Sequence, residues 1–443
     1  MCRMESRDCV INREEERSMT NNSRGGAAVV CLLVWIVCLG ITNVSYADNA
    51  EVLPKGVRNL SVEGLFYFPI EKQFDDDGNV EEVATDYNGV LDSNIFADLG
   101  LVEAGFGMPP GSANVGTSDV SFKYNFTILK LTFMYGITDR FTAGIKIPYW
   151  WAKNTVDRRL DASQATVGKN PFYGLPADPF GGSPFVPIAF GGVKLTTDDV
   201  LDLLGKGLDV NNDGTIDIPG YKYKKFATWS NNGIGDIEIG GRYQYLKTDN
   251  WRLAFTGGVR FPTGEIDDPD NLVDYGIGNG AYALLFHLNN DYTGIKNTVL
   301  NATLRYHLVL PAKETLRIPD DVDRPITANK ENVDRDIGDV FELEVSGKYV
   351  FAKGFSAELL YLFGYGFKDR INGNRGYSYE SLEDESNYSE HVFIGGLSYS
   401  TLPLFQEKKF PLPMTFSLSY RNRFAGENAL KSQYISAGLQ IYF

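Results

Sequence analysis

The chain has 443 residues, a formal charge of −15 and only four cysteines. All four (Cys2, Cys9, Cys31 and Cys38) precede residue 48. The rest of the chain therefore excludes disulfides, thiol catalysis and cysteine metal sites, and its acidic balance excludes nucleic acid as a partner.

The N-terminal residues 1–47 have the pattern of a cleaved signal peptide. Arg24 precedes an apolar run from Ala27 to Ile41, and Ser45-Tyr46-Ala47 places small residues where a signal peptidase reads them. The run is shorter than the roughly 20 residues of a membrane-spanning helix, which is the alternative. We predict cleavage after Ala47; residues 1–18, which precede Met19, are either part of this leader or a misassigned start.

Residues 48–443 show repeated segments in which apolar and polar residues alternate, which is the pattern of transmembrane β-strands. Without a membrane helix, only a closed barrel can satisfy the backbone inside a bilayer. We therefore predict an all-β fold, a transmembrane antiparallel up-and-down β-barrel of about twelve strands. The predicted strands are 58–68, 122–135, 141–151, 233–247, 251–262, 276–288, 298–310, 339–351, 355–367, 390–402, 414–424 and 432–443.

Short and long connections alternate between these segments. The shorter ones are 136–140, 248–250, 289–297, 352–354 and 403–413. The long ones are 69–121, 152–232, 263–275, 311–338 and 368–389; only the last hairpin, 425–431, is short on the long side. Bacterial barrels place short turns in the periplasm and long loops outside, so the pattern predicts long extracellular loops with 152–232 as the largest insertion.

The chain ends on an amphipathic strand that finishes at Phe443. Such an end resembles the signal by which the barrel-assembly machinery recognises its clients. We expect the outer membrane of a Gram-negative bacterium as the location, with its lipid and lipopolysaccharide as surroundings.

Three motifs carry a family resemblance. They are Tyr135-Gly-Ile-Thr-Asp-Arg-Phe-Thr-Ala-Gly-Ile-Lys-Ile-Pro-Tyr149, Gly233-Ile-Gly-Asp-Ile-Glu-Ile-Gly-Gly-Arg-Tyr243 and Gly258-Val-Arg-Phe-Pro-Thr-Gly-Glu265. Over residues 120–310 the chain resembles the outer-membrane transporter family named after the meta-cleavage pathway of phenol degradation. The resemblance implies a barrel that passes small, often aromatic or hydrophobic compounds.

If apolar residues face lipid, their charged neighbours on the strands face the lumen. An Arg or Lys facing lipid would cost about 2–4 kcal/mol at the midplane. These side chains can form a charged constriction that selects solutes, or structural salt bridges that fill a narrow barrel. The set is Lys146, Asp236, Glu238, Arg242, Arg252, Arg260, Arg305, Glu342, Glu344, Lys348, Glu358, Arg421 and Arg423.

The large insertion contains a motif similar to an EF-hand or dockerin-type calcium loop, after a helical-looking stretch at Thr197–Leu204. Its oxygen ligands for Ca²⁺ would be Asp209, Asn211, Asp213, the carbonyl of Thr215, and Asp217. Position 12 is Gly220 in place of the usual glutamate, so we expect weak binding. The alternative is a polar turn rich in Asn and Asp; no other cofactor is expected.

The same insertion holds an apolar stretch rich in Pro, Gly and aromatic residues at 170–188. A stretch this apolar is not expected to lie bare in solvent. Phe172, Tyr173, Phe180 and Phe185 would form a lid over the barrel mouth, or they would pack on neighbouring loops.

Two functions fit these features. The first is a porin-like transporter for passive uptake or export of a small, aromatic or hydrophobic solute. The second is a non-transporting barrel that acts as a surface adhesin or scaffold. We expect no enzyme activity, because the three histidines (His287, His307 and His391) form no catalytic pattern with a serine nucleophile.

Overall fold

The computed structural model describes residues 47–319 and 326–443. The predicted signal peptide lies outside the described residues, except for Ala47. None of the helices in the described ranges is long and apolar enough to cross a membrane.

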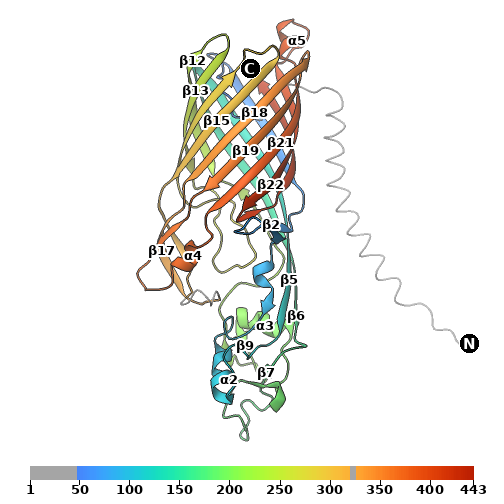
Figure 1. The fold of residues 1–443 in the computed structure, drawn as a ribbon, viewed down its shortest axis with the longest axis vertical. Helices are drawn as coiled ribbons and strands as arrows, with labels where there is room; N and C mark the ends of the chain where they lie inside the picture. The colour runs from blue at the N-terminus through green and yellow to red at the C-terminus, as the bar shows by residue number, and fades with distance from the viewer. Residues whose placement is uncertain (1–46, 320–325) are drawn as a thin grey trace, which may run out of the picture.

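Twelve antiparallel strands close into a barrel, because β1 pairs with β24 on one side and with β5 on the other (Figure 1). The predicted up-and-down transmembrane barrel is confirmed. Its strands are β1 (Arg58–Tyr67), β5 (Thr117–Thr138), β6 (Phe141–Asp161), β12 (Ile237–Lys247), β13 (Trp251–Phe261), β14 (Ala283–Tyr292), β15 (Thr298–Val309), β18 (Val340–Ala352), β19 (Phe355–Gly366), β21 (Tyr388–Ser400), β22 (Met414–Glu427) and β24 (Gln433–Tyr442).

The predicted strands are all present, but the bounds of three differ markedly. β5 and β6 have 22 and 21 residues and continue well past the barrel. Their extensions bury Phe122, Tyr124 and Val156 in an apolar cluster, which gives the extra strand length something to pack on. β14 begins at Ala283, later than predicted, because Gly276 and Gly278 allow the preceding segment to fold back onto residues 264–267.

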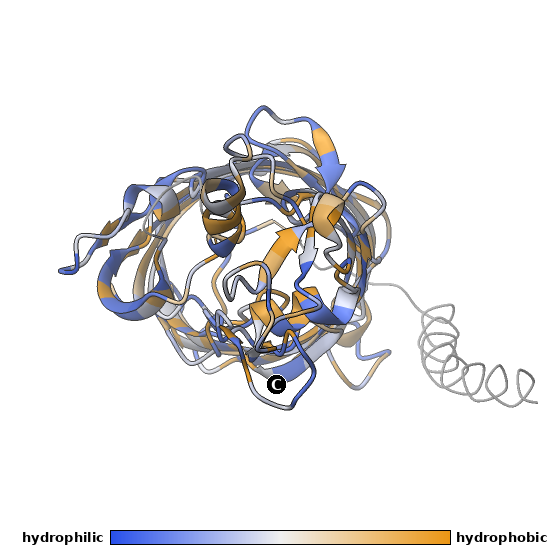
Figure 2. Cartoon of the chain, turned by 90° about the horizontal axis from the view of Figure 1, so that it is seen from below, coloured by the Kyte–Doolittle hydropathy of each residue, from blue (hydrophilic) through white to orange (hydrophobic). Residues whose placement is uncertain are grey.

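The two faces of the barrel wall differ in polarity, as the alternation along the strands in Figure 2 illustrates. Large apolar side chains are exposed on the outside, where a lipid bilayer would cover them. Examples are Leu131, Phe133, Ile239, Tyr243, Phe255, Leu288, Leu304, Val345, Leu359, Phe393, Leu397, Leu418 and Ile435. Polar and charged residues at the alternate positions face inward.

The two ends of the barrel also differ. One end carries short turns, including the turn that holds α5 (Leu402–Gln406), and the C-terminus lies there (Figure 1). The other end carries the long loops, with two small accessory sheets and a short helix. One sheet holds β2 (Lys72–Phe74), β3 (Val80–Glu82) and β23 (Ala429–Leu430); the other holds β16 (Ala312–Arg317), β17 (Lys330–Asp336) and β20 (Arg370–Asn372), with α4 (Glu380–Glu383) beside it. Two short strands extend the main sheet here: β4 (Gly89–Val90) pairs with β5, and β11 (Trp229–Ile234) pairs with β6.

A distal unit stands at the far end of the long β5–β6 hairpin (Figure 1). Its core includes Leu99, Val167, Phe185 and Leu208. The elements around this core are α2 (Asp98–Phe106), β7 (Val167–Lys169), β8 (Phe185–Pro187), η2 (Ile188–Phe190), α3 (Thr197–Leu204), β9 (Gly207–Leu208) and β10 (Ile218–Pro219). α3 has the predicted bounds and begins with a capping box between Thr196 and Asp199.

An aromatic cap lies between the barrel and the distal unit. It consists of η1 (Thr85–Tyr87), the β5–β6 extensions and loop 262–282, which share one apolar cluster. Tyr275 of the loop packs on Phe126 with ring centroids 4.8 Å apart. In the same loop, burial and the neighbouring Asp267 carboxylate raise the pKa of Asp274 to about 7.

The raised pKa of Asp274 predicts that the stability of loop 262–282 depends on pH. The folded loop keeps a proton on Asp274 that the unfolded chain releases near pH 4, so the packing weakens as pH rises from about 4 to about 7. Asp274→Asn should therefore slow proteolysis of loop 262–282 at about pH 8 and change little at about pH 4.

Asp268→Asn is the matched control, with the opposite sign. Although burial opposes it, the ion pair with Lys224 lowers the pKa of Asp268, so ionisation of this residue stabilises the loop. The variant should be cleaved no more slowly than the parent at about pH 8. Equal pH profiles for the parent and Asp274→Asn would contradict the proposed protonation.

Candidate functional site

The N-terminal tail, residues 47–57, enters the barrel at the short-turn end and runs into the lumen. Near the entrance, Gly56 N donates to Gly136 O over 2.8 Å. Along the inner wall, Leu53 N donates to Thr142 Oγ1 over 2.7 Å, and Ala50 N donates to Asp291 Oδ2 over 3.1 Å. The partners of the tail thus lie on several neighbouring strands, from β6 to β15, and the tail brings Asp48 into the lumen across them.

The Asp48 carboxylate is the centre of the lumen's ion-pair network. Its two oxygens bind the guanidinium of Arg242, the ring of His287 and, over 3.2 Å, the guanidinium of Arg305. These three partners come from β12, β14 and β15, so one tail residue joins neighbouring strands across the inner wall. A buried carboxylate is stable only when it is paired in this way.

Arg305 is shared by three carboxylates. Besides Asp48, it pairs with Glu342 over 2.8 Å and with Glu344. Glu344 in turn accepts a hydrogen bond from the backbone N–H of Asp48 over 2.7 Å, and Glu358 accepts one from Ala47 N over 3.2 Å. Both glutamates are almost fully buried, with 3% and 2% of their surface exposed.

Polar side chains of the wall also bind the tail's carbonyls. Asn289 Nδ2 and Thr303 Oγ1 each donate to the carbonyl of Asp48 over 2.7 Å. Gln244 Nε2 donates to the carbonyl of Ala50 over 2.7 Å. An unpaired buried carbonyl would cost about 1–3 kcal/mol, so the wall is chemically matched to the tail's backbone.

Two further ion-pair groups line the lumen. Glu238 pairs with Lys146 over 2.6 Å and with Arg260 over 3.1 Å. Towards the long loops, Glu390 pairs with Arg421 over 3.1 Å and with Arg423 over 2.7 Å. The inner wall therefore carries both charge signs in close pairs.

A cavity of about 1490 Å³ remains beside the tail. Its lining includes the charged side chains described above and an apolar part with Leu65, Tyr67, Trp150, Leu360 and Leu362. Tyr67 packs on Tyr434 with ring centroids 4.6 Å apart. The lumen thus has a charged middle and an aromatic, aliphatic stretch.

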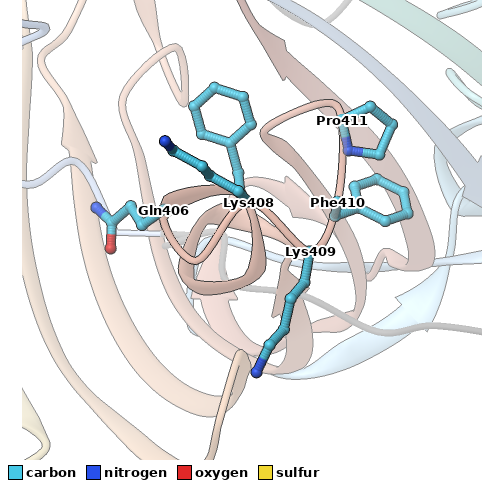
Figure 3. A pocket seen from close by; sticks show the side chains of 6 residues that line it. Gln406, Lys408, Lys409, Phe410 and Pro411 are labelled. Carbon is cyan, nitrogen blue, oxygen red and sulfur yellow. The ribbon is translucent and has the colours of Figure 1, made fainter.

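A second cavity, of about 600 Å³, lies on the turn that holds α5 (Figure 3). Phe405, Gln406 and Pro411 line both this cavity and the lumen cavity. Lys408 and Lys409 extend from the same turn (Figure 3). The turn therefore forms part of the lumen's short-turn mouth.

The predicted lumen residues occupy three different positions. Nine of them line the cavity: Lys146, Glu238, Arg242, Arg260, Arg305, Glu342, Glu344, Lys348 and Arg421. Glu358 and Arg252 contact the tail, the latter through an ion pair with Glu51. Asp236 and Arg423 lie nearer the long loops, where Asp236 accepts from Gly264 N and Asn279 N.

The predicted lid over the barrel mouth is corrected by the structure. The β5–β6 hairpin carries the insertion away from the mouth, and Phe185 is buried in the core of the distal unit. Tyr173 packs against that core, and the rings of Phe172 and Phe180 lie 6.3 Å apart. Packing on neighbouring loop residues is therefore the alternative that holds.

The predicted calcium loop connects β9 and β10. Its carboxylates accept backbone N–H groups: Asp209 from Asp213 and Gly214, Asp213 from Thr215, and Asp217 from Val210. Across the described part of the chain, no three His, Cys, Asp or Glu side chains are grouped to hold a metal. Calcium binding, which would also use Asn211, stays a prediction.

The residues that the tail contributes are absent from the lumen set predicted from sequence. Asp48 and Glu51 precede the first predicted strand, and alternation assigns a facing direction only within strands. One signal was present: basic side chains outnumber acidic ones in the predicted lumen set. A low-dielectric interior needs more carboxylates to balance them, and the tail supplies two.

Arg305→Gln tests the network. It leaves the carboxylates of Asp48, Glu342 and Glu344 close together without their shared cation, and we expect the free energy of unfolding to fall by about 3–5 kcal/mol. Urea unfolding in lipid vesicles, followed by tryptophan fluorescence, measures the change.

Arg159→Gln is the control, because Arg159 forms an exposed pair with Asp119 on the β5–β6 extension. Exposed pairs contribute about 0–1 kcal/mol, so this variant should unfold nearly as the parent does. Equal losses in the two variants would contradict a central role for Arg305.

Several solved structures resemble the fold. One is an outer membrane channel from Pseudomonas putida F1, with 13% identity, 90% of this chain and 100% of that chain covered, and a TM-score of 0.49. A FadL homologue from Pseudomonas aeruginosa has 11% identity, 89% and 90% coverage and a TM-score of 0.30. The toluene transporter of Ralstonia pickettii has 11% identity, 92% and 96% coverage and a TM-score of 0.32. No curated protein matches the chain.

A family model also matches the chain. The family model described as "Putative MetA-pathway of phenol degradation" matches residues 187–437, more than half of the chain. The match begins later than the motif resemblance and continues through most of the C-terminal strands. The chain belongs to this family of the MetA pathway of phenol degradation.

Proposed function

We propose that the protein is an outer-membrane channel for a small, aromatic or hydrophobic solute, and that its N-terminal tail closes the lumen at rest. The observation that carries this proposal is the tail beside a cavity of about 1490 Å³. Hydrogen bonds and ion pairs hold the tail, and such contacts can break and re-form. A closed and an open state are therefore both accessible to one chain.

The orientation follows from the connections. Short turns belong in the periplasm, so the tail would enter from the periplasmic side and the distal unit would stand outside the cell. The apolar outer band suits contact with membrane lipid. Lipopolysaccharide and the barrel-assembly machinery remain predicted partners.

The lumen offers two kinds of surface along the path of a solute, one apolar and one charged. The stretch around Tyr67, Trp150 and Leu362 offers apolar and aromatic surface to a solute that enters between the long loops. The charged middle, which includes Arg242 and Arg305, would then set size and charge limits once the tail moves. The direction of net flow would follow the solute gradient.

A surface adhesin or scaffold remains the second candidate. It is favoured by the distal unit, where Leu101, Leu175 and Phe190 are exposed by 74%, 55% and 57%. Exposed apolar groups of this kind are typical of contact surfaces. In a channel the tail has to leave the lumen for the solute to pass, whereas in a scaffold the tail stays bound in the lumen.

Shortening the tail separates the two candidates. Deleting residues 49–53 keeps Asp48 at the predicted cleavage position but removes the length that carries it to Arg242 and Arg305. We expect a several-fold larger single-channel conductance in planar bilayers, because the tail no longer occupies the lumen.

Deleting residues 171–182 is the control for this measurement. It shortens the connection between β7 and β8 in the distal unit, outside the residues that line the lumen cavity. Conductance should match the parent. Parent-like conductance in the tail variant as well, with a folded barrel on heat-modified gels, would rule out the closing role of the tail.

A further inference from the structure

The end of the tail lies among buried carboxylates. Asp48 N is 2.7 Å from Glu344 Oε1, and Ala47 N is 3.2 Å from Glu358 Oε1. Ala47 is only 6% exposed and lies against Leu360, Leu362 and Val392 of the wall. Two acidic side chains therefore face the bond that joins Ala47 to Asp48.

This bond is also where the sequence predicts cleavage, since Ser45-Tyr46-Ala47 precedes it. Hydrolysis adds water across the amide, leaving a carboxylate on Ala47 and an amine on Asp48 that takes up a proton. The new ammonium would form at the atom that already donates to Glu344. It would have three protons to donate in place of one.

We propose that the mature chain begins at Asp48 and that Glu344 and Glu358 form a receptor for its α-ammonium group. Removal of the leader would then create the cation that locks the tail in the lumen. This inference deepens the proposed closing role of the tail and rests on it.

Electrostatics favours a cation at this point. Glu342, Glu344 and Asp48 share the guanidinium of Arg305, so Glu344 competes for that positive charge. Loss of Ala47 also removes one donor from Glu358 Oε1, which keeps its hydrogen bond from Ser346 Oγ over 3.2 Å. A charge-assisted hydrogen bond to an ammonium is about twice as strong as one to a neutral amide.

The receptor also links processing to tail position. An uncleaved chain has a neutral amide at Asp48, which can donate only one hydrogen bond. A chain cut elsewhere would carry its ammonium away from Glu344 and Glu358. The network would thus hold a correctly processed tail more firmly than any other.

The first test is the N-terminus itself. Intact-mass and N-terminal sequencing of protein purified from outer membranes should find Asp48 as the first residue. A mature chain that starts at any other residue overturns the proposal.

The second test is the reactivity of the amine. In protein folded in lipid vesicles, the α-amine should acetylate about tenfold or more slowly than in the urea-unfolded chain, since a larger fraction stays protonated. Mass spectrometry of the N-terminal peptide gives the rate. Glu358→Gln should return most of the lost reactivity, and the Glu344→Gln/Glu358→Gln double variant should return nearly all of it.

Glu63→Gln is the matched control, because Glu63 pairs with Lys130 on β1 and β5 and has no contact with the tail's end. It should leave the amine protected. Protection that survives Glu358→Gln and the double variant would come from burial alone, because glutamine keeps the shape of glutamate, and would overturn the receptor.

The two proposals fail in different ways. If deletion of residues 49–53 opens the channel while the amine reacts freely, the tail closes the lumen but the receptor is wrong. If the amine is protected by the glutamates but the deletion leaves conductance unchanged, the receptor stands as an anchor and the closing role is wrong.

Discussion

The ion pairs of Asp48 with Arg242 and Arg305 are the constraint on which the lumen's arrangement depends. A narrow barrel with inward-facing arginines needs carboxylates in the same low-dielectric space. The wall provides some of them, but it concentrates Glu342 and Glu344 on a single guanidinium, that of Arg305. The tail adds Asp48 between Arg242 and Arg305, and its backbone carbonyls accept hydrogen bonds from Asn289, Thr303 and Gln244 of the wall.

The same network shapes how the lumen could open. Moving the tail exposes paired charges to water, which compensates much of the lost pairing because both partners become hydrated together. Removing only one partner, as in an arginine variant, leaves a buried charge without compensation and costs far more. A tail held by paired charges can therefore bind firmly in the lumen and still leave it. A purely apolar plug would expose hydrocarbon to water on every opening.

The barrel could be predicted from sequence because strand alternation has a strict period of two residues, so Arg252, Arg260 and Arg305 could each be assigned to the inner face. The tail could not, because residues 48–57 form no strand and alternation does not apply to them. The prediction that the aromatic stretch forms a lid over the barrel mouth was wrong for a related reason. Its composition showed that Phe185 must be covered, but the length of the β5–β6 hairpin decides what covers it.

The position of the tail inside the lumen is tested most directly by amide hydrogen exchange. Ala50 N and Leu53 N donate to Asp291 and Thr142 of the wall, and Ala50 is fully buried. Measured by mass spectrometry on the full mature chain in lipid vesicles, the amides of Ala50 and Leu53 should exchange as slowly as those of the neighbouring barrel strands. Exchange at the rate of a free peptide would contradict the account, because it would place the tail outside the barrel.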